Sequence, residues 1–518
     1  MYMTQTLHRA ARLHPTKLAT IYGDRRTDYG SMQDRVSRFA GALRKLGVSP
    51  GDRVGMLSLN SDRYLEYYFS VYWAGGVVNP ANIRWSANEI AYSFADCDTQ
   101  VLLIDDQFLP MLGAIRELAP CVKTVIHCGD AATPEGLLNY EWLIAETAPC
   151  DDAMRSGEDL AGIFYTGGTT GFPKGVMLPH RALYANGLTL VTEGIDTRRF
   201  IGLHAAPMFH LADHAFTNAL AMGGGTHVML PVFNPQAVAE TIAREKVNAA
   251  MLVPTMIQML VDAPVTRQYD LSTLEFMLYG GSPIAEAVVD RTLALMPHVK
   301  MMQAYGMTEV APVATVLPHE FHIGEWRQKG KTRSAGRPAM ICDVRIVDAN
   351  DVEVPRGTIG EVAVRGPGVM LGYWNKPKET AEAIKDGWMH TGDGGYMDDE
   401  GFVYIADRIK DMIVTGGENV YSIEVENAVA KYPGVMQCAV IGIPDDKWGE
   451  VVHVFVVPHA GASVTIEAIR EHCKAMIANY KLPRSLEIIE ALPMSGAGKI
   501  LKNKLREKFW AGRDRKVG

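Results

Sequence analysis

Cysteine is scarce and shows no pairing pattern in this chain of 518 residues. There are seven cysteines, an odd number, and no two of them form a CxxC pair. Disulfide frameworks and structural zinc sites usually show an even set or short characteristic spacings. We therefore expect neither kind of site, and reduced thiols indicate a cytoplasmic protein.

Long apolar runs and an excess of positive charge are also missing. The longest apolar stretches, such as residues 250–254, fall far short of the roughly 20 residues that span a membrane, and residues 1–17 lack the apolar core of a signal peptide. The formal net charge is −8, which disfavours non-specific binding to nucleic acid because such binding needs a basic surface. Hydrophobic residues make up 47% and charged residues 21%, which excludes wholesale disorder. We expect an intracellular globular protein with no integral membrane segment and no nucleic-acid partner.

The first part of the chain alternates helix-like and strand-like segments. Apolar residues recur at helical spacing through Ser31–Leu46, with Gly47 as a stop signal, and Tyr64–Trp73 has a similar pattern. Short apolar segments between them predict strands at Arg53–Leu59, Val101–Ile104 and Val122–His127. Helices alternating with short buried strands predict layered α/β structure with parallel sheet. The length itself predicts several domains, at about 100–200 residues each.

The pattern changes twice towards the C-terminus. From about Ser334, alternating segments bounded by turns predict a β-rich part, with strands at Asp343–Asp348, Gly360–Arg365 and Gly401–Ala406. From Asp411, two strands and an amphipathic helix over Thr465–Tyr480, capped by Thr465, predict a compact α+β domain. The two strands are Val435–Ile441 and Val451–Val457.

Glycine, threonine and lysine are concentrated in Tyr165–Gly175 (YTGGTTGFPKG), directly after the apolar segment Leu160–Phe164. Glycine lets backbone N–H groups approach an anion, threonine hydroxyls donate hydrogen bonds, and lysine adds a positive charge. We interpret the segment as a phosphate-binding loop whose contacts are Thr166, Gly167, Gly168, Thr169, Thr170, Gly171 and Lys174. Its spacing is not that of a Walker loop, and the chain has no GxGxxG, KxDG, GxSxG or HExxH motif.

This loop resembles the phosphate loop, YTSGTTGxPKGV, of the acyl-adenylate-forming superfamily, with Gly167 in place of a common serine. The superfamily includes fatty-acid and 4-coumarate CoA ligases, peptide-synthetase adenylation domains and beetle luciferase. Further segments resemble its other motifs in the same order along the chain: Tyr279–Pro283, Gln303–Glu309 (QAYGMTE), Trp388–Asp393 (WMHTGD), Asp407–Lys410 (DRIK), Gly416–Tyr421 and Gly498–Ile500 (GKI). One such motif would be weak, whereas the ordered set is specific.

The resemblance implies roles for the residues around the nucleotide. Tyr305 is expected to lie against adenine, Thr308 to contact the α-phosphate and Glu309 to bind Mg²⁺. An aromatic face suits a purine, and a hard carboxylate oxygen suits Mg²⁺. Asp393 and Arg408 are expected to reach the ribose. Beside the adenine and the acyl group we expect Gly280, Gly281 and Ser282.

The resemblance also implies a division of the chain. An N-terminal adenylate-forming lobe, residues 1–409, would hold the ATP and acyl pockets in layered α/β subdomains plus a β-rich subdomain. A small mobile α+β domain, residues 410–518, would follow, with Lys410 as the hinge. Gly416 and Gly417 would line the channel for CoA, and Lys499 would meet the substrate carboxylate and the α-phosphate.

The activity implied by the resemblance is that of an AMP-forming acyl-CoA ligase. A carboxylate is a poor acylating agent, so the enzyme first transfers AMP from ATP to it and then passes the acyl group to the thiol of CoA. ATP and CoA are thus co-substrates and Mg²⁺ is the cofactor. The catalytic residues implied are Lys499, Glu309, Thr308 and His210.

The acyl pocket is expected around Pro207–His210, which resembles the PMFH segment at the pocket entrance of the superfamily. The residues expected to line it are Phe209, Leu211, Ala212, Ala304, Met307 and Ala311. Small and apolar side chains favour a hydrophobic carboxylic acid, fatty or aryl. Asp213 lies beyond the position at which peptide-synthetase domains place an aspartate for an amino group.

Two other functions stay open at this point: a free-standing enzyme that loads a carrier protein, and a non-catalytic nucleotide-binding protein. The sequence does not identify the acid. The expected partners are a small carboxylic acid, ATP and CoA, with a homodimer as a further expectation.

Overall fold

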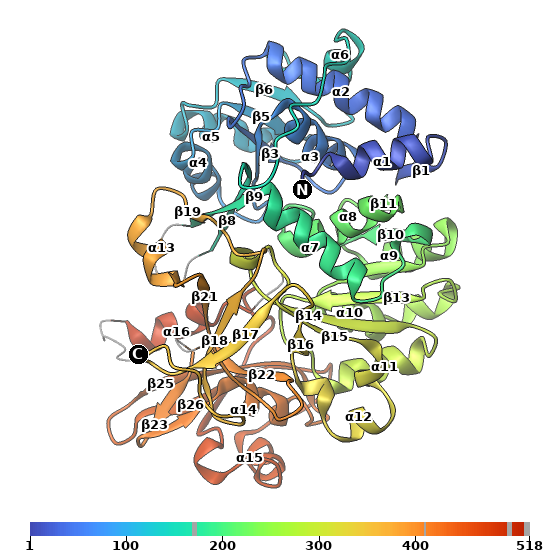
Figure 1. The fold of residues 1–518 in the computed structure, drawn as a ribbon. Coiled ribbons are helices and arrows are strands. Elements are labelled where there is room, and N and C mark those ends of the chain that lie inside the picture. The colour runs from blue at the N-terminus through green and yellow to red at the C-terminus, as the bar shows by residue number, and fades with distance from the viewer. Residues whose placement is uncertain (168–172, 409–410, 495–499, 512–518) are drawn as a thin grey trace.

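The computed structural model describes residues 1–167, 173–408, 411–494 and 500–511, and within them the chain forms four β-sheets flanked by helices (Figure 1). Three sheets are built from residues up to Arg408, and the fourth from residues after 411. The predicted class is therefore confirmed: multidomain α/β with a β-rich part and a C-terminal α+β domain. Within the described ranges, no helix is both long and apolar enough to cross a membrane.

The N-terminal sheet has eight strands in the order β19-β9-β8-β4-β3-β5-β6-β7. These are β3 (Arg53–Leu57), β4 (Val77–Pro80), β5 (Val101–Ile104), β6 (Thr124–His127), β7 (Leu138–Asn139), β8 (Leu160–Thr166), β9 (Lys174–Pro179) and β19 (Gly372–Tyr373). Its helices are α2 (Tyr29–Lys45), α3 (Asp62–Ala74), α4 (Ala87–Asp96), α5 (Leu112–Leu118) and α6 (Tyr140–Ala145). Strands β3 to β7 pair in parallel, and every residue of β4 and β5 is buried, as expected of parallel strands covered on both faces.

The second sheet has nine strands in the order β16-β15-β14-β13-β12-β10-β11-β1-β2. They are β1 (Leu18–Tyr22), β2 (Arg25–Asp28), β10 (Ile201–His204), β11 (Thr226–Met229), β12 (Ala249–Leu252), β13 (Phe276–Gly280), β14 (Lys300–Tyr305), β15 (Thr315–Leu317) and β16 (Arg337–Pro338). The helices nearby are α1 (Gln5–Leu13), α7 (His180–Thr192), α8 (Leu211–Gly223), α9 (Pro235–Glu245), α10 (Pro254–Asp262), α11 (Glu286–Leu295) and α12 (Gly324–Gln328). The first two strands of the chain thus complete a sheet whose other strands come from residues after 200.

The β-rich part is an antiparallel sheet, as its alternating pattern predicts. It contains β17 (Asp343–Val347), β18 (Gly360–Arg365), β20 (Ile384–Lys385), β21 (Trp388–Met397) and β22 (Val403–Arg408), with α13 (Pro377–Ala383) beside it. Short 3-10 turns occur at η1 (Leu109–Met111), η2 (Thr197–Arg199), η3 (Pro264–Gln268), η4 (Thr308–Val310), η5 (His319–His322), η6 (Lys331–Arg333) and η7 (Asn479–Lys481).

The C-terminal domain has its own sheet and its own apolar core. Its strands are β23 (Ile413–Thr415), β24 (Glu418–Val420), β25 (Val435–Asp445), β26 (Gly449–Pro458) and β27 (Ser485–Ile488), and its helices are α14 (Ser422–Val429), α15 (Ile466–Lys474) and α16 (Lys502–Trp510). The Thr465 hydroxyl accepts the N–H of Ala468 and caps α15, as predicted. The helix ends at Lys474, earlier than the predicted Tyr480, because a 3-10 turn replaces its last part.

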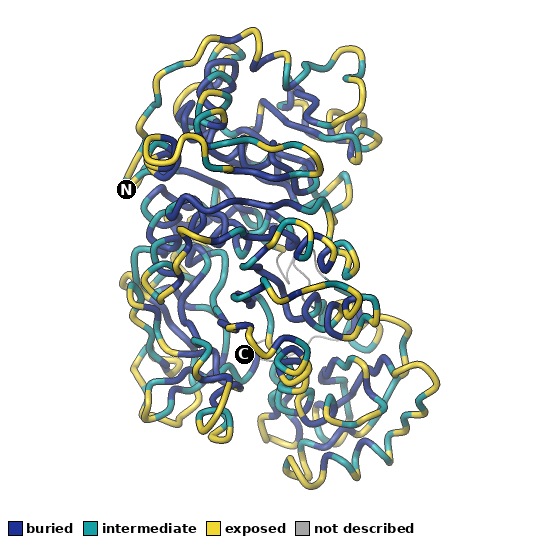
Figure 2. The backbone as a smooth tube through the Cα atoms, turned by 90° about the vertical axis from the view of Figure 1, so that its right-hand side faces the viewer, coloured by how far each residue is buried: buried dark blue, intermediate teal, exposed yellow. Residues whose placement is uncertain are grey.

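The C-terminal domain forms a separate body at the lower right of Figure 2. Polar contacts join it to the N-terminal lobe. Lys431 Nζ lies 3.5 Å from Glu286 Oε2 of α11, and Gln258 Nε2 of α10 donates to the Met436 carbonyl at 3.0 Å. The predicted boundary between residues 409 and 410 lies outside the described residues and remains a prediction.

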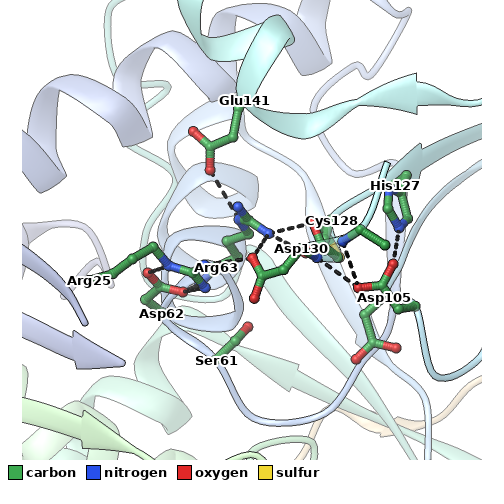
Figure 3. Close-up of polar contacts among 12 residues, drawn as sticks. Arg25, Ser61, Asp62, Arg63, Asp105, His127, Cys128, Asp130 and Glu141 are labelled. Carbon is green, nitrogen blue, oxygen red and sulfur yellow. Dashed lines mark hydrogen bonds and ion pairs between the residues drawn. The ribbon is translucent and has the colours of Figure 1, made fainter. Parts of the chain in front are cut away.

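An ion-pair network joins the edge of the second sheet to the N-terminal sheet (Figure 3). Arg25 of β2 donates to both carboxylate oxygens of Asp62 at 2.8 and 2.9 Å. The neighbouring Arg63 donates to Glu141 of α6 at 3.0 Å and to Asp130 at 2.9 Å, and Arg25 reaches Asp130 as well. Since Arg25 belongs to one sheet and the other residues to elements packed on the other, the network helps to hold the two sheets together.

Candidate active site

A cavity of about 2280 Å³ lies between the N-terminal lobe and the C-terminal domain. It brings together most of the residues that the sequence singled out, although they come from different sheets. The predicted site residues that line it are Thr166, Gly167, Lys174, Phe209, His210, Leu211, Ala212, Gly280, Gly281, Ser282, Ala304, Tyr305, Met307, Thr308, Glu309 and Asp393.

The glycine-rich segment connects two antiparallel strands at the edge of this cavity. Strand β8 ends at Thr166 and β9 begins at Lys174, and these two residues pair directly across the hairpin. Thr166, Gly167 and Lys174 therefore lie at its tip and line the cavity. Four predicted phosphate contacts, Gly168, Thr169, Thr170 and Gly171, lie outside the described residues.

Two predicted nucleotide residues are joined by a hydrogen bond. Tyr305 ends β14 and Asp393 lies in β21, and the tyrosine hydroxyl donates to Asp393 Oδ2 at 2.8 Å. The backbone of Arg408 pairs with that of Asp393 at the end of β22. An aromatic ring and a charged acceptor thus lie side by side on the cavity wall, and these are the groups predicted to contact adenine and ribose.

Glu309 is buried in η4, directly after Thr308, and its side chain faces the same cavity. Its Oε1 accepts a hydrogen bond of 2.8 Å from the hydroxyl of Tyr373. Burial, followed by the nearby Glu309 carboxylate, raises the pKa of Tyr373, so the hydroxyl stays protonated and acts as the donor. The ring of Tyr373 also makes a cation–π contact with Lys174, whose Nζ lies 4.0 Å from the ring centroid.

Tyr373 lies in none of the motifs that indicate the site in the sequence. It directly follows Gly366–Gly372, a glycine-rich stretch whose spacing does not match a dinucleotide-binding GxGxxG motif. The sequence feature that could have indicated Tyr373 is the preceding Gly372. This glycine has a φ of +142°, and a Cβ added to it would lie 2.7 Å from the Thr380 side chain. A glycine required by close packing next to an aromatic residue marks a fixed turn.

His210 forms the start of α8 and lines the cavity. Its Nδ1 accepts the N–H of Ala212 at 3.2 Å, so a neutral ring carries its proton on Nε2. The residue is therefore a helix cap as well as a cavity residue. Asp213 turns away from the cavity: it is fully buried and its Oδ2 lies 2.9 Å from His204 Nδ1.

Small residues line the part of the cavity where the acyl group is predicted to bind. Ala212 of α8 and Ala304 of β14 line it, and a Cβ on Gly280 would lie 2.2 Å from the Ala304 carbonyl oxygen. Apolar residues that the sequence reading missed, including Met251, Leu278 and Val313, extend this lining. Met251 and Leu278 lie side by side because β12 pairs with β13, and the sequence does not specify this pairing.

Ala311 requires a correction. It was expected in the pocket wall, but it does not line the cavity in the described part of the chain and is buried among core side chains. The reason is local backbone geometry: Ala311 ends η4 in a left-handed conformation with φ of +69°, which turns it away from Met307 and Thr308.

Of the predicted segment Gly498–Ile500, the structure describes Ile500 alone. Met494 and Ile500, which flank residues 495–499, both line the cavity. Lys499 itself lies outside the described residues, as does Lys410. Gly416 and Gly417 lie in the exposed turn between β23 and β24 and are not among the cavity residues of the described chain.

Comparison with known proteins identifies relatives along the whole chain. Residues 7–374 match the family of AMP-binding enzymes, and residues 424–499 match the AMP-binding enzyme C-terminal domain. A feruloyl-CoA synthase of an Amycolatopsis species is 38% identical over 506 residues, which cover 97% of this chain and 98% of the relative. A fatty acid–acyl-carrier-protein ligase of Streptomyces coeruleorubidus is 34% identical over 521 residues, which cover 99% and 98%.

Solved structures agree with the sequence matches. An anthranilate CoA ligase in complex with anthranoyl-AMP superposes with a TM-score of 0.92 at 26% identity, covering 98% of this chain and 97% of that one. The prediction of an acyl-adenylate-forming enzyme that acts as an AMP-forming acid–thiol ligase is thereby confirmed. The chain belongs to the AMP-binding enzyme family.

Proposed function

We propose that the cavity activates a hydrophobic carboxylic acid, fatty or aryl, with ATP and transfers its acyl group to CoA. The observation that carries this proposal is the common cavity: the Tyr305–Asp393 pair, the carboxylate of Glu309 and a wall of small apolar residues all face it. An acyl-adenylate requires one cavity that accommodates its nucleotide, its charged phosphate and its apolar acyl group.

The first step joins two anions. An oxygen of the substrate carboxylate attacks the α-phosphorus of ATP, the bond from that phosphorus to the bridging oxygen breaks, and pyrophosphate leaves. Lys174 at the hairpin tip and Lys499 offset negative charge in this step, and Thr308 donates to the α-phosphate. The Nε2–H of His210 donates to the substrate carboxylate at the mouth of the acyl pocket.

The residues present fit a Mg²⁺ ion. Glu309 supplies a hard oxygen ligand. Of its two carboxylate oxygens, only Oε1 accepts a hydrogen bond from a described residue. Mg²⁺ is commonly held by one or two carboxylates together with substrate phosphates. When bound, it would neutralise charge on the phosphate oxygens.

In the second step the sulfur of CoA attacks the acyl carbon, and AMP leaves as its oxygen takes the bonding electrons. We propose that Gly416 and Gly417 line the path of the thiol after the C-terminal domain turns about Lys410, which would remove Lys499 from the cavity. Residues 1–409 and 410–518 are the two parts that would move.

Replacing Lys499 tests the proposal. Lys499→Ala should slow formation of the acyl-adenylate by about 10²–10³-fold, since its charge acts only in that step, and should spare thioester formation from synthetic acyl-adenylate and CoA. Lys474→Ala, which removes an exposed lysine of α15 that is not among the cavity residues, is the matched control. Equal damage to both half-reactions would remove Lys499 from the role.

A second candidate acceptor is a carrier protein. The observation in its favour is the 34% identity over nearly the whole chain to a fatty acid–acyl-carrier-protein ligase. Supplying the acyl-adenylate with either CoA or a phosphopantetheinylated carrier protein separates the two acceptors. Transfer to the carrier alone would replace CoA in the proposal.

The acid itself is best sought with a panel of fatty, cinnamic and benzoic acids, read by AMP release in the presence of CoA. A homodimeric assembly and a cytoplasmic location remain predictions.

A further inference from the structure

Tyr373 contacts two groups of opposite charge at the site. Its hydroxyl donates to Glu309 Oε1 at 2.8 Å, and Lys174 Nζ lies 4.0 Å from the centroid of its ring. Tyr373 is 5% exposed and borders the cavity together with both partners. A cation over an aromatic face and a phenol bound to a carboxylate are each favourable, and here one side chain makes both contacts.

The backbone holds Tyr373 in this place from three sides. Strand β19 pairs with β9, so that Tyr373 lies opposite Val176 in the strand that begins at Lys174. The Tyr373 N–H donates to Thr380 Oγ1 at 2.9 Å, and the N–H of Met370 donates to the carbonyl of Glu309 at 2.9 Å. The segment is therefore fastened to the strand of the lysine, to α13 and to the turn that carries the glutamate.

We propose that Tyr373 is a positioning residue for adenylation: its hydroxyl orients the carboxylate of Glu309, and its ring keeps Lys174 from pairing directly with that carboxylate. A lysine and a buried carboxylate attract each other strongly at low effective dielectric constant. A direct pair would occupy the two charges that the nucleotide phosphates and Mg²⁺ need. This inference rests on the proposed roles of Lys174 and Glu309.

Two substitutions separate the two parts of this role. Tyr373→Phe removes the hydroxyl and keeps the ring under Lys174, whereas Tyr373→Leu removes both. Calorimetric titration of a non-hydrolysable ATP analogue, with and without Mg²⁺, measures binding without any turnover. Loss of an outer partner of a metal ligand typically costs about 10–100-fold in metal affinity.

We expect Tyr373→Phe to raise the half-saturating Mg²⁺ concentration by about 10-fold or more and to leave metal-free binding of the analogue unchanged. Tyr373→Leu should show the same loss and also weaker metal-free binding, because Lys174 is then drawn to Glu309. ATP–pyrophosphate exchange should fall in both variants, and thioester formation from synthetic acyl-adenylate should not.

Tyr140→Phe is the matched control. The hydroxyl of Tyr140 donates to Glu66 Oε2 at 2.7 Å in the buried core of the N-terminal sheet, so this variant loses a comparable bond away from the cavity. It should lower the melting temperature and leave the Mg²⁺ dependence unchanged. A Mg²⁺ dependence of Tyr373→Phe equal to that of Tyr140→Phe overturns the inference.

Glu309→Gln distinguishes failure of this inference from failure of the proposed function. If Glu309→Gln leaves the Mg²⁺ dependence unchanged, the proposed metal role of Glu309 is wrong and the inference falls with it. If Glu309→Gln abolishes the dependence and Tyr373→Phe does not alter it, only the inference about Tyr373 is wrong.

A second variant tests the inference if Tyr373→Phe fails to fold. Thr380→Val removes the acceptor for the Tyr373 N–H and should shift the Mg²⁺ dependence in the same direction. No shift in the Mg²⁺ dependence of Thr380→Val overturns the inference.

Discussion

Single small residues set the space at the proposed acyl end of the cavity. Gly280 allows β13 to approach β14 so closely that even an alanine Cβ would lie 2.2 Å from the Ala304 carbonyl oxygen. Ala212 in the first turn of α8 lines the same cavity and contributes only a methyl group to it. Because interiors are packed as densely as organic crystals, the walls yield little to a larger side chain.

Ala212→Trp should therefore restrict the enzyme to shorter acids. We expect long or bulky acids to lose kcat/KM by about 10-fold or more, and short acids such as butyrate to lose little. The measurement is kcat/KM across a series of chain lengths, together with the melting temperature. A uniform loss at all chain lengths, with a lower melting temperature, would show that Ala212 only packs the lobe.

At the scale of elements, contacts between side chains hold the sheets together where backbone pairing cannot. Arg63 of α3 is the centre of the network in Figure 3, with a side chain only 10% exposed and partners on α6 and after β6. It also donates to the carbonyl oxygens of Cys128 and Gly129 at 2.9 and 2.7 Å. Removing it would leave buried acceptors without a donor.

Arg63→Met should destabilise the N-terminal lobe by about 1–3 kcal/mol, a modest value because Glu141 and Asp130 are partly exposed and can be hydrated. Arg291→Met is the control, because Arg291 and its partner Asp262 are both exposed, and we expect about 0–1 kcal/mol there. Urea unfolding followed by tryptophan fluorescence measures both. Equal effects of the two variants would contradict a special role for the network.

At the scale of the whole molecule, buried histidines make stability depend on pH. Burial lowers the pKa of His214 to about 3 and those of His180 and His322 to about 4. In the unfolded chain a histidine has a pKa near 6.5. Between these values the unfolded chain binds more protons than the folded one, so the free energy of unfolding falls as the pH falls.

We therefore expect the melting temperature to decrease steadily from about pH 7 to about pH 4. His214→Gln should flatten this dependence, because it removes one of the groups that only the unfolded chain protonates. His14→Gln, at an exposed position, should leave the slope as it is. A slope unaffected by His214→Gln would show that other groups control the acid response.

The two-body architecture yields a further prediction at this scale. Lys410→Pro restricts the backbone at the proposed pivot to a φ of about −65°. Adenylation and thioester formation should then separate, with one retained and the other lost. Equal and modest losses in both half-reactions would place the pivot elsewhere.

Local features of this protein follow from the sequence alone. Strands β3, β5, β6 and β8 and the cap at Thr465 depend on residues close together in the chain, where hydrophobic periodicity and hydroxyl side chains act directly. The ordered motifs likewise identify the chemistry, because each motif is a short contiguous stretch. Helix α15 was predicted too long, since a 3-10 turn at its end depends on packing rather than on periodicity.

Contacts between distant residues were decided by the tertiary structure. Tyr373 meets Glu309 across 64 residues and Tyr305 meets Asp393 across 88, and both pairs depend on the order in which strands join the sheets. Asp213 turns into the core and Ala311 turns out of the pocket because helix and turn geometry, not residue type, sets where each side chain points. Sequence neighbours determine the local conformation, whereas sheet order and register determine which distant groups share one cavity.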